Sequence, residues 1–318
     1  MRLVVALGGN ALLRRGERAE AAVQQAHVRE AVAALAALAE RHELVITHGN
    51  GPQVGLLALE ADAYTEVAPY PLDVLGAESQ GMIGYFLTQS LAGRTGGRGV
   101  VAVLTQVVVD ENDAAFARPT KPIGPVYDGV EAARLAAERG WTVAADGPHV
   151  RRVVASPEPR EIVELAAIER LLAAGQVVVC AGGGGIPVVR RNGGLAGVEA
   201  VVDKDLTACL LAESLSADRL VMLTDVECVE RGWGTSGAVP IHRTSPVELR
   251  ALDFAPGSMA PKVEAACRFV ERTGGRAAIG SLDDVAGVVA GSSGTQVRSV
   301  VATVEPRVFH KSGRSAAV

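Results

Sequence analysis

The chain has 318 residues, a formal net charge of −5 and a hydrophobic content of 48%. Basic and acidic residues are interspersed and aromatic residues make up 3%, which leaves neither a basic stripe nor stacking platforms and excludes nucleic acid as the expected partner. No apolar run approaches the roughly 20 residues of a membrane span. The first residues enter a strand directly and lack a signal-peptide pattern, so we expect a cytoplasmic protein with no membrane contact.

Strands, glycine turns and helices alternate from the first residues onward. Leu3–Leu7 and Leu44–Thr47 are predicted strands, and each ends in a turn that combines glycine with asparagine. A predicted helix over Ala19–Arg41 lies between them, with apolar residues on one stripe. This alternation predicts a parallel sheet with helices on both faces. Ligands of such sheets bind beyond the carboxyl ends of the strands, where these turns lie.

The middle of the chain departs from this pattern. Pro71–Leu91 is predicted to be a helix, and Val100–Val109 one long apolar strand or hairpin arm. Asp110–Pro159 then holds six prolines, and we interpret it as an excursion from the sheet with a helix over Val130–Arg139. Lys121 stands between two prolines that fix the backbone, which is consistent with a presented charge and equally with an ordinary solvated lysine.

The most informative stretch begins at a predicted buried strand, Val177–Cys180, which the four glycines Gly182–Gly185 follow. Glycine tolerates positive φ and has no Cβ, so backbone N–H groups can converge on a ligand. The charged residues Asp203–Asp205 then precede a predicted helix over Leu206–Leu215, at an N-terminus where the helix dipole favours anions. The stretch predicts a phosphate site. The alternative is a flexible glycine loop followed by an ordinary acidic helix start.

The last third of the chain returns to the strand–helix pattern, with an irregular region predicted over Glu230–Ser245. The predicted strands are Arg219–Leu223, Arg276–Ile279 and Val297–Val301. A helix is predicted from Pro261, with Lys262 in its first turn. A cation there opposes the helix dipole, and an anionic ligand would account for it. Residues 303–318 are polar and aperiodic, and we predict a poorly ordered tail.

Several common chemistries do not fit. The chain has no GxxxxGK[ST] P-loop and no GxSxG elbow, and Gly49–Gly55 resembles a dinucleotide fingerprint only with its last glycine one residue late. The six histidines form no HExxH motif and no close pair, so we predict no zinc site. We interpret the four cysteines as buried free thiols. They are Cys180, Cys209, Cys228 and Cys267.

Lysine is rare in this chain, and its positions are informative. Three of the four lysines, Lys121, Lys204 and Lys262, lie in structured contexts, and the fourth, Lys311, lies in the tail. Where arginine is the usual surface cation, a retained lysine suggests a need for a compact point charge. Phosphoryl transfer needs charge and positioning around the phosphoryl oxygens rather than covalent help. Three lysines and several glycine turns match that demand.

Seven motifs carry a more specific signal. They are Gly8–Ala11 (GGNA), His48–Gly55 (HGNGPQVG), Leu104–Val107 (LTQV), Thr120–Pro125 (TKPIGP), Gly182–Val188 (GGGGIPV), Gly197–Asp205 (GVEAVVDKD) and Pro256–Lys262 (PGSMAPK). In this order, over about residues 1–298, they resemble the motifs of the carbamate kinases, a family within the amino-acid-kinase superfamily. Any one of them is weak alone, but the ordered set is specific.

The resemblance implies an α/β fold: a three-layer αβα sandwich with an open, mainly parallel eight-stranded sheet. It implies one domain over residues 1–302, with a small subdomain protruding over about residues 112–165, and a homodimer. The implied reaction is reversible, direct in-line phosphoryl transfer between carbamoyl phosphate and ADP, giving ATP and carbamate, in arginine metabolism. Mg2+ is expected to arrive with ADP or ATP, held by the nucleotide phosphates and not directly by the protein.

The resemblance also implies roles for individual residues. The catalytic residues would be Lys121, Lys204, Asp205 and Lys262, with the lysines neutralising charge and the aspartate orienting them. The substrate and phosphoryl group would be held by Gly8, Gly9, Asn10, Gly49, Asn50 and Gly51. The nucleotide site would be lined by Gly182, Gly183, Asp203, Thr224, Asp225, Gly257, Ser258 and Met259.

The chain departs from the family in more than one place. Its tail beyond about Arg298 exceeds the usual family end, and Glu227–Ser236 is not closely diagnostic of the family. The family commonly has an aromatic-containing GRGWRR sequence where this chain reads Gly147–Arg152 (GPHVRR), at the expected tip of the subdomain. Two other functions stay open from the sequence. One is a kinase for another small carboxylate or a phosphonate. The other is a catalytically silent regulator that binds nucleotide.

Overall fold

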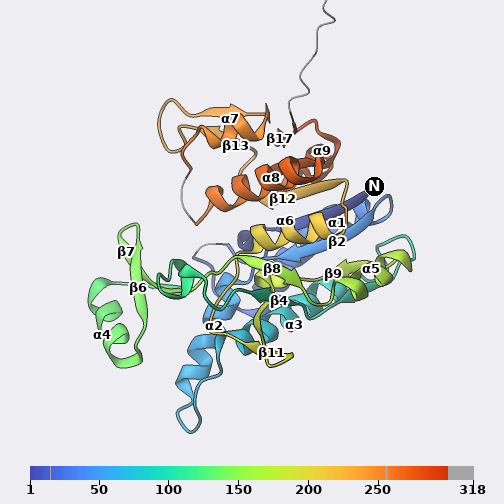
Figure 1. Ribbon diagram of the computed structural model, residues 1–318. Coiled ribbons are helices and arrows are strands. Elements are labelled where there is room, and N and C mark those ends of the chain that lie inside the picture. Colours follow the sequence, from blue (N-terminus) through green and yellow to red (C-terminus); the bar gives the residue numbers. More distant parts are fainter. Residues whose placement is uncertain (15, 255–256, 300–318) are drawn as a thin grey trace, which may run out of the picture.

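The computed structural model describes residues 1–14, 16–254 and 257–299. Its centre is an eight-stranded sheet in the order β15-β17-β16-β12-β1-β2-β9-β3 (Figure 1). The strands are β1 (Arg2–Leu7), β2 (Glu43–His48), β3 (Val100–Ala102), β9 (Val177–Val179), β12 (Arg219–Thr224), β15 (Arg243–Thr244), β16 (Arg276–Ser281) and β17 (Thr295–Val297). All neighbours pair in parallel except β16 and β17. The predicted open, mainly parallel sheet is confirmed.

Helices cover both faces of this sheet. One face is covered by α1 (Ala21–Ala39), α3 (Leu72–Leu91) and α9 (Val285–Ala290), whose buried side chains share one apolar cluster. The other is covered by α5 (Leu165–Ala173), α6 (Lys204–Ser214), α7 (Pro246–Arg250) and α8 (Met259–Thr273). A further helix, α2 (Gly51–Ala63), follows β2. This is the predicted three-layer arrangement.

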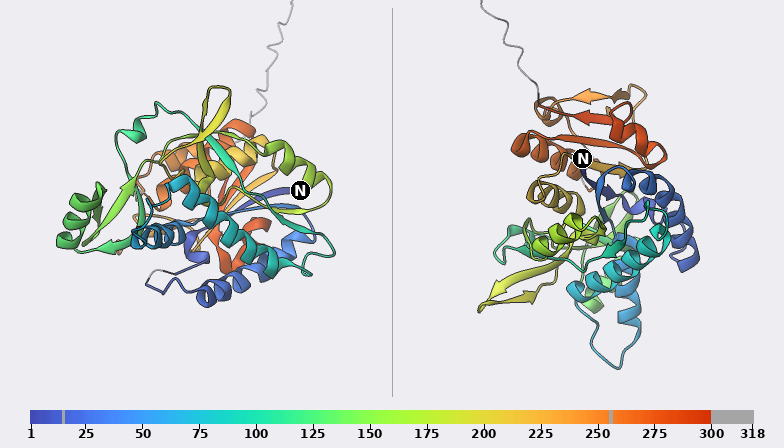
Figure 2. Two further views of the ribbon diagram at one scale, coloured as in Figure 1. Left: turned by 90° about the horizontal axis from the view of Figure 1, so that it is seen from below. Right: turned by 90° about the vertical axis from the view of Figure 1, so that its right-hand side faces the viewer.

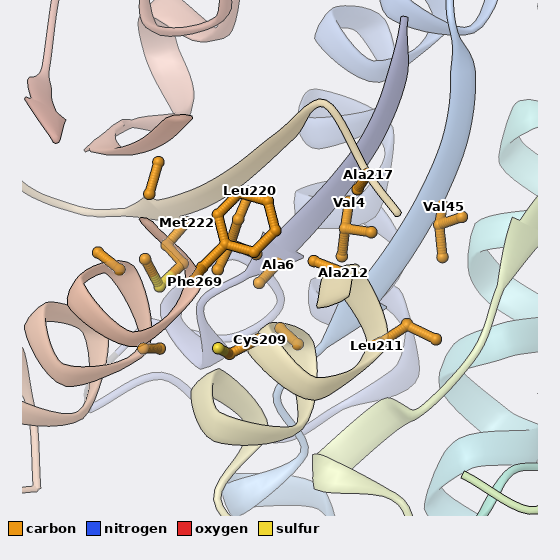
Figure 3. Close-up of a cluster of buried hydrophobic side chains, with 14 of the residues drawn as sticks. Val4, Ala6, Val45, Cys209, Leu211, Ala212, Ala217, Leu220, Met222 and Phe269 are labelled. Carbon is orange, nitrogen blue, oxygen red and sulfur yellow. The ribbon is translucent and has the colours of Figure 1, made fainter. Parts of the chain in front are cut away.

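The two apolar clusters meet through the alternation of side chains along the central strands. Leu3 and Val5 of β1 belong to the cluster under α1 and α3, whereas Val4 and Ala6 belong to the cluster under α6 and α8. Figure 3 shows part of the second cluster, in which Phe269 of α8 is fully buried. Burial on both faces explains why these strands read as continuous apolar runs in the sequence.

Two smaller sheets and a hairpin extend from the sandwich. The four-stranded sheet has the order β11-β10-β4-β8 and the three-stranded sheet the order β5-β7-β6, with α4 beside it. The bounds are β4 (Gln106–Val109), β5 (Lys121–Tyr127), α4 (Gly129–Arg139), β6 (Thr142–Asp146), β7 (His149–Val154), β8 (Pro159–Ile162), β10 (Ile186–Arg191) and β11 (Gly194–Gly197). The hairpin pairs β13 (Val229–Arg231) with β14 (Val239–Ile241). The three-stranded sheet and α4 project from the body in Figure 1 and in the left view of Figure 2.

The projecting sheet approaches the body where two glycines meet. Gly124 of β5 has a φ of +68°, and a Cβ on Gly55 of α2 would lie 2.2 Å from the Gly124 Cα. Backbone therefore packs on backbone at this contact, with no space for a side chain on Gly55. Lys121, three residues before Gly124, is thereby carried toward the body of the molecule.

Several sequence predictions of secondary structure were wrong. Val100–Val109 is not one strand, because the chain leaves the large sheet after β3, turns at Thr105, and joins the small sheet as β4. Thr105 is held in that turn by Gln80, whose side chain binds both the Thr105 N–H and C=O. Glu230–Ser245 is not irregular throughout but contains β14 and β15 and the end of β13. The α6 helix begins at Lys204 rather than Leu206, because Asp203 caps it.

The start of α8, the four cysteines and the end of the chain were also predicted from the sequence. The helix predicted from Pro261 starts earlier than predicted. α8 begins at Met259, two residues before Pro261, which is tolerated because the first N–H groups of a helix have no partner within it. The four cysteines are buried and free, as interpreted. The strand predicted over Val297–Val301 was placed wrongly, because the strand is β17 at Thr295–Val297 and Arg298 and Ser299 lie beyond it. Residues 300–301 and the predicted tail over 303–318 lie outside the described residues. Across the described ranges, no helix is both long enough and apolar enough to cross a membrane.

Candidate active site

The first turn of α6 gathers charges from three parts of the chain. The Asp203 side chain caps the helix, accepting hydrogen bonds from the N–H groups of Asp205 at 2.9 Å and Leu206 at 3.3 Å. One oxygen of Asp205, Oδ2, lies 2.9 Å from Lys204 Nζ and 3.1 Å from Lys262 Nζ. A single carboxylate oxygen therefore fixes two ammonium groups side by side.

This group is largely withdrawn from solvent: Asp205 is 2% exposed, Lys262 is 8% exposed and the Lys204 side chain is 16% exposed. Burial lowers the pKa of Lys262 below its usual value, and the Lys204 charge adds to this effect while Asp205 opposes it. Burial acts on Lys204 in the same direction, but Asp205 and Asp203 outweigh it and raise its pKa. Lys262 is therefore the ammonium that loses its proton more readily.

The other oxygen of Asp205, Oδ1, is buried and has no hydrogen-bond partner among the described residues. An unpaired buried charged oxygen carries a desolvation cost, which a hydrogen-bond donor would relieve but a phosphate oxygen, itself an acceptor, would not. This unsatisfied atom is at the centre of the charge cluster.

Lys121 reaches the same cluster from the projecting sheet. Its Nζ lies 2.5 Å from Asp203 Oδ2, across 82 positions of sequence. Burial alone would raise the pKa of Asp203, but Lys121 and Lys204 outweigh burial and hold it below its usual range. All three lysines singled out in the sequence thus meet at Asp203 and Asp205, and the reading of Lys121 as an ordinary solvated lysine does not hold.

The two N-terminal glycine turns lie beside these lysines, at the carboxyl ends of β1 and β2. The Gly8 N–H donates to the Leu223 carbonyl at 2.9 Å, and the Gly49 N–H donates to the Leu7 carbonyl at 3.0 Å. A Cβ on Gly49 would lie 3.1 Å from the Gly9 nitrogen and 3.2 Å from Lys204 Cδ. The turns and the Lys204 stem are therefore in close contact.

Asn10 and Gly51 are the remaining residues expected to bind ligand in these two turns. Asn10 lies in a short 3-10 turn, Gly9–Ala11, and its side chain falls outside the described part of the structure. Gly51 begins α2, with open space where its Cβ would point.

The four-glycine turn packs tightly against both regions. Gly183 has a φ of +66°, and its Cβ would lie 2.1 Å from Asn50 Nδ2. A Cβ on Gly184 would lie 2.3 Å from the Val202 carbonyl oxygen, next to Asp203. The Thr207 hydroxyl of α6 donates to the Gly184 carbonyl at 2.9 Å. The turn is therefore a buried joint between the Asn50 turn and the start of α6, and not a flexible loop.

Asp203 belongs to the charge cluster and Gly182 and Gly183 to the four-glycine turn, whereas the other residues expected around the nucleotide lie outside both. Thr224 ends β12, and its Cα would be 3.7 Å from a Cβ on Gly8. Its hydroxyl donates to the Asp225 carboxylate at 3.0 Å. Gly257 and Ser258 are exposed before α8, and no hydrogen bond or ion pair within the described ranges joins them to the lysines. Met259 is half-buried and packs against the core.

Sequence reasoning assigned no role to several residues that shape the site. The Asn50 side-chain amide donates to the Ser79 hydroxyl of α3 at 2.8 Å, which orients Asn50. His48 is buried against Gly182, donates from Nδ1 to the Gly49 carbonyl, and has its pKa lowered by burial to about 4, so it is neutral at pH 7. His48 directly follows the predicted strand Leu44–Thr47 and ends β2, and its position at a strand end is a usable signal. Ser79 and Thr207 carry none, because their partners are distant in sequence.

The arrangement suits a phosphoryl group in transfer. Glycine N–H groups, ammonium groups and a helix N-terminus converge at the carboxyl ends of parallel strands. Such fixed donors and charges stabilise negative charge that develops on oxygen during a reaction.

Comparison with known proteins gives a consistent result. Residues 1–281 match the amino acid kinase family. The chain is 52% identical over 303 residues to a carbamate kinase of Rhizobium meliloti, covering 94% of both chains. It is 52% identical over 293 residues to a carbamate kinase of Escherichia coli, covering 92% of this chain and 98% of the relative.

Solved structures agree with these relatives. The carbamate kinase of Giardia lamblia bound to AMP-PNP superimposes with a TM-score of 0.85 at 38% identity, over 93% of this chain and 98% of that one. The chain therefore belongs to the amino acid kinase family.

Proposed function

We propose that this chain catalyses the carbamate kinase reaction, the reversible transfer of a phosphoryl group between carbamoyl phosphate and ADP to give ATP and carbamate. The observation that carries the proposal is the convergence of Lys204 and Lys262 on one oxygen of Asp205, beside the glycine turns. We propose the carbamate kinase reaction rather than another kinase reaction because relatives that are 52% identical to this chain are carbamate kinases.

The proposed step is a direct in-line displacement. An oxygen of the ADP β-phosphate attacks the phosphorus of carbamoyl phosphate, the bond from phosphorus to the carbamoyl oxygen breaks, and carbamate leaves with that oxygen and its electron pair. No covalent enzyme intermediate forms. Lys204 and Lys262 neutralise the charge spread over the transferred oxygens, and Asp205 keeps the two ammonium groups in place.

We assign the glycine turns to the transferred group and the carbamate. Gly8, Gly9 and Asn10 follow β1, and Gly49, Asn50 and Gly51 follow β2, so both turns lie in the region beyond the strand ends. The Gly8 and Gly49 N–H groups are bonded to strand carbonyls, so we assign these two glycines to the close approach of backbone to ligand, and hydrogen bonding to the other N–H groups of the turns. Positioning of the two reactants there contributes to the rate, because it converts their encounter into a step within one complex.

Lys121 is proposed to act from the projecting subdomain. In the structure it is paired with Asp203. A bound phosphate dianion offers this ammonium a second partner with greater charge, so we propose that Lys121 turns from Asp203 to carbamoyl phosphate when substrate binds. The subdomain is assigned to about residues 112–165, within a domain that spans 1–302.

The nucleotide is proposed to lie beyond β9 and β12. Gly182, Gly183 and Asp203 border it on one side, and Thr224, Asp225, Gly257, Ser258 and Met259 on the other. Mg2+ bound to ADP or ATP would supply positive charge at the phosphate oxygens. Both oxygens of Asp203 are engaged, one by the helix N-terminus and one by Lys121. We therefore propose that phosphates and water, rather than protein side chains, provide most of the metal ligands.

We propose further that two copies associate through exposed side chains of the α2–α3 connection, residues 64–71, and of α3. This tyrosine patch consists of Tyr64, Val67, Tyr70, Val74 and Tyr85, each exposed by between 37% and 61%. It holds three of the four tyrosines in a chain with few aromatics, and the α2–α3 connection projects from the body (Figure 2). Exposed aromatic clusters of this kind are typical of interfaces. We also propose that the protein acts in the cytoplasm, in arginine metabolism.

The decisive experiment measures ATP formed from carbamoyl phosphate and MgADP with a coupled assay. We expect ATP in proportion to carbamoyl phosphate consumed. Acetyl phosphate serves as a competing donor with ADP, and a small phosphonate as a competing acceptor with ATP. Faster ATP formation from acetyl phosphate, or faster ATP consumption with the phosphonate, would assign a different substrate. Nucleotide binding without ATP formation from any donor would instead indicate a silent regulator and overturn the proposal.

A further inference from the structure

A hollow of about 600 Å³ lies at the edge of the large sheet where β15, β16 and β17 meet. It is lined by Arg243, Thr244, Ser245, Glu248, Gly274, Gly275, Arg276, Arg298 and Ser299. Its volume falls within the range of small-molecule sites, about 300–1,000 Å³. The elements around it, α7, α8 and β17, lie together at the top of Figure 1.

The hollow lies at the opposite end of the strands from the lysine cluster. Arg276 is the first residue of β16, and Ser281, the last, pairs with Thr224 beside the Gly8 turn. A six-residue strand spans about 17 Å at a rise of about 3.3 Å per residue. The hollow is therefore separate from the proposed active site.

Arginines gather at this edge on adjacent strands. Ala277 pairs with Val297 in the antiparallel ladder of β16 and β17, so Arg276 and Arg298 are the next residues facing each other. On its other side Arg276 pairs with Arg219 of β12. Arg243 adds a further guanidinium from β15. Like charges that face each other across strands destabilise a sheet, so an anion bound between these arginines would relieve the repulsion. The side chains of Arg243, Arg276 and Arg298 are exposed, and water already screens part of it.

The protein itself supplies little compensation. Arg243, Arg276 and Arg298 form no ion pair within the described residues, whereas the nearby Arg250 and Arg272 each pair with a glutamate. Among the described lining residues Glu248 is the one acidic side chain, and it supplies a single negative charge against three guanidinium groups. Its Oε2 accepts hydrogen bonds from the Ser245 N–H and hydroxyl and from the Thr244 hydroxyl, closing the capping box of α7.

We propose that this hollow is a second anion-binding site, which takes a small oxyanion carrying at least two negative charges. Guanidinium groups suit such a ligand, because their planar N–H forks bind phosphate or carboxylate oxygens in pairs. A multiply charged anion relieves the repulsion between Arg276 and Arg298 and fits the volume available. The proposal does not depend on the reaction at the lysine cluster.

The test uses the full-length protein and two probes, pyrophosphate and citrate, in titration calorimetry. The variant Arg276→Gln/Arg298→Gln removes the facing pair. Arg29→Gln is the matched control, because Arg29 is an exposed arginine on α1 far in sequence from the hollow. Lys204→Ala/Lys262→Ala reports binding at the active site. Pyrophosphate binding identifies a phosphate ligand and citrate binding a polycarboxylate, and either supports an oxyanion site.

We expect the double arginine variant to bind whichever probe the parent protein binds at least about tenfold more weakly than the parent does. Tenfold is the scale for losing a charge-assisted contact. Arg29→Gln should bind that probe as the parent protein does, and the lysine variant should retain it. Without probe, the double arginine variant should unfold at a temperature equal to or higher than that of the parent protein. The probe should raise the unfolding temperature of this variant by less than it raises that of the parent protein. Equal binding in the double arginine variant, binding lost only with the lysines, or no binding of either probe would overturn the proposal.

Discussion

Lys262 and Asp205 are separated by 57 positions in the sequence, yet Lys262 Nζ lies 3.1 Å from Asp205 Oδ2 in a nearly buried pair. Removing both charges from water is costly, and a buried ion pair is weak support for stability by itself. The pair is better explained by function, because Lys204 shares the same oxygen and the Asp205 Oδ1 stays unsatisfied. The site is thus organised before any ligand arrives.

The lysine pair gives the first prediction. Lys204→Ala and Lys262→Ala should each lower kcat by about 10²–10³-fold, the scale for losing one preorganised charge-stabilising donor. Initial rates of ATP formation measure this. Arg272→Ala, on the outer end of α8, is the matched control and should keep kcat within about twofold. Turnover close to that of the parent protein in both lysine variants would remove the assignment.

A second prediction concerns pH. Because burial lowers the pKa of Lys262, its charge should be lost as pH rises through a value below the ordinary lysine pKa of about 10.4. We therefore expect kcat to fall on the alkaline side. Asp205→Asn removes the opposing carboxylate and should shift this fall to lower pH. Profiles of kcat against pH measure the shift.

The control for the pH profile is Lys262→Arg, in which the charge persists at all accessible pH values. That variant should lose the alkaline fall even where kcat is reduced. An alkaline limb that stays in place in both Asp205→Asn and Lys262→Arg would show that another group titrates.

A third prediction concerns stability in acid. The folded pKa of Asp203 lies below its unfolded value, so its stabilising contribution is complete above about pH 3.9 and is lost as pH falls through the folded pKa. Asp203→Asn keeps the helix cap, because asparagine caps as well as aspartate, but removes the charge that holds Lys121. Chemical denaturation should show a smaller acid-induced loss in the variant. An identical acid dependence would argue against the Lys121 pairing.

The four-glycine turn gives a fourth prediction. Gly183→Ala and Gly193→Ala both place a side chain at positive φ, which costs about 1–2 kcal/mol. Only Gly183→Ala also drives its Cβ into Asn50, whereas Gly193 has open space. We expect both variants to lose stability, and only Gly183→Ala to lose kcat/KM. Equal kinetics in the two variants would separate the turn from the site.

The tyrosine patch gives a fifth prediction. Tyr64→Arg/Tyr70→Arg should reduce the mass measured by light scattering to that of one chain, since two charges would face the same surface on a partner. Trp233→Arg is the control, because Trp233 is 63% exposed on the β13–β14 connection. An unchanged mass in the tyrosine variant would move the interface elsewhere.

Sequence reasoning succeeded where one physical signal dominates. The buried runs of β1, β2 and β12 are apolar on both faces, so their positions follow from hydropathy alone. It failed at Val100–Val109, because periodicity does not say which sheet a strand joins. The start of α6 was missed because Asp203 was interpreted only as a ligand-facing charge and not as a helix cap.

For the site, the sequence motifs named the lysines and glycines but not how they meet. The pairing of Lys121 with Asp203 depends on where the projecting sheet stands, which no local pattern contains. Ser79 was invisible because its role comes only through Asn50. Contacts made across large sequence separations require the fold.

The charge cluster and the beginning of α6 are built from the same three consecutive residues. Asp203 starts the helix and holds one lysine, Lys204 is the helix's first residue, and Asp205 holds two more ammonium contacts. Sliding this helix start by a single residue would rotate every one of these groups by about 100° and separate them all at once. A redesigned chain therefore cannot start α6 at a different residue without separating the charged groups of the proposed site.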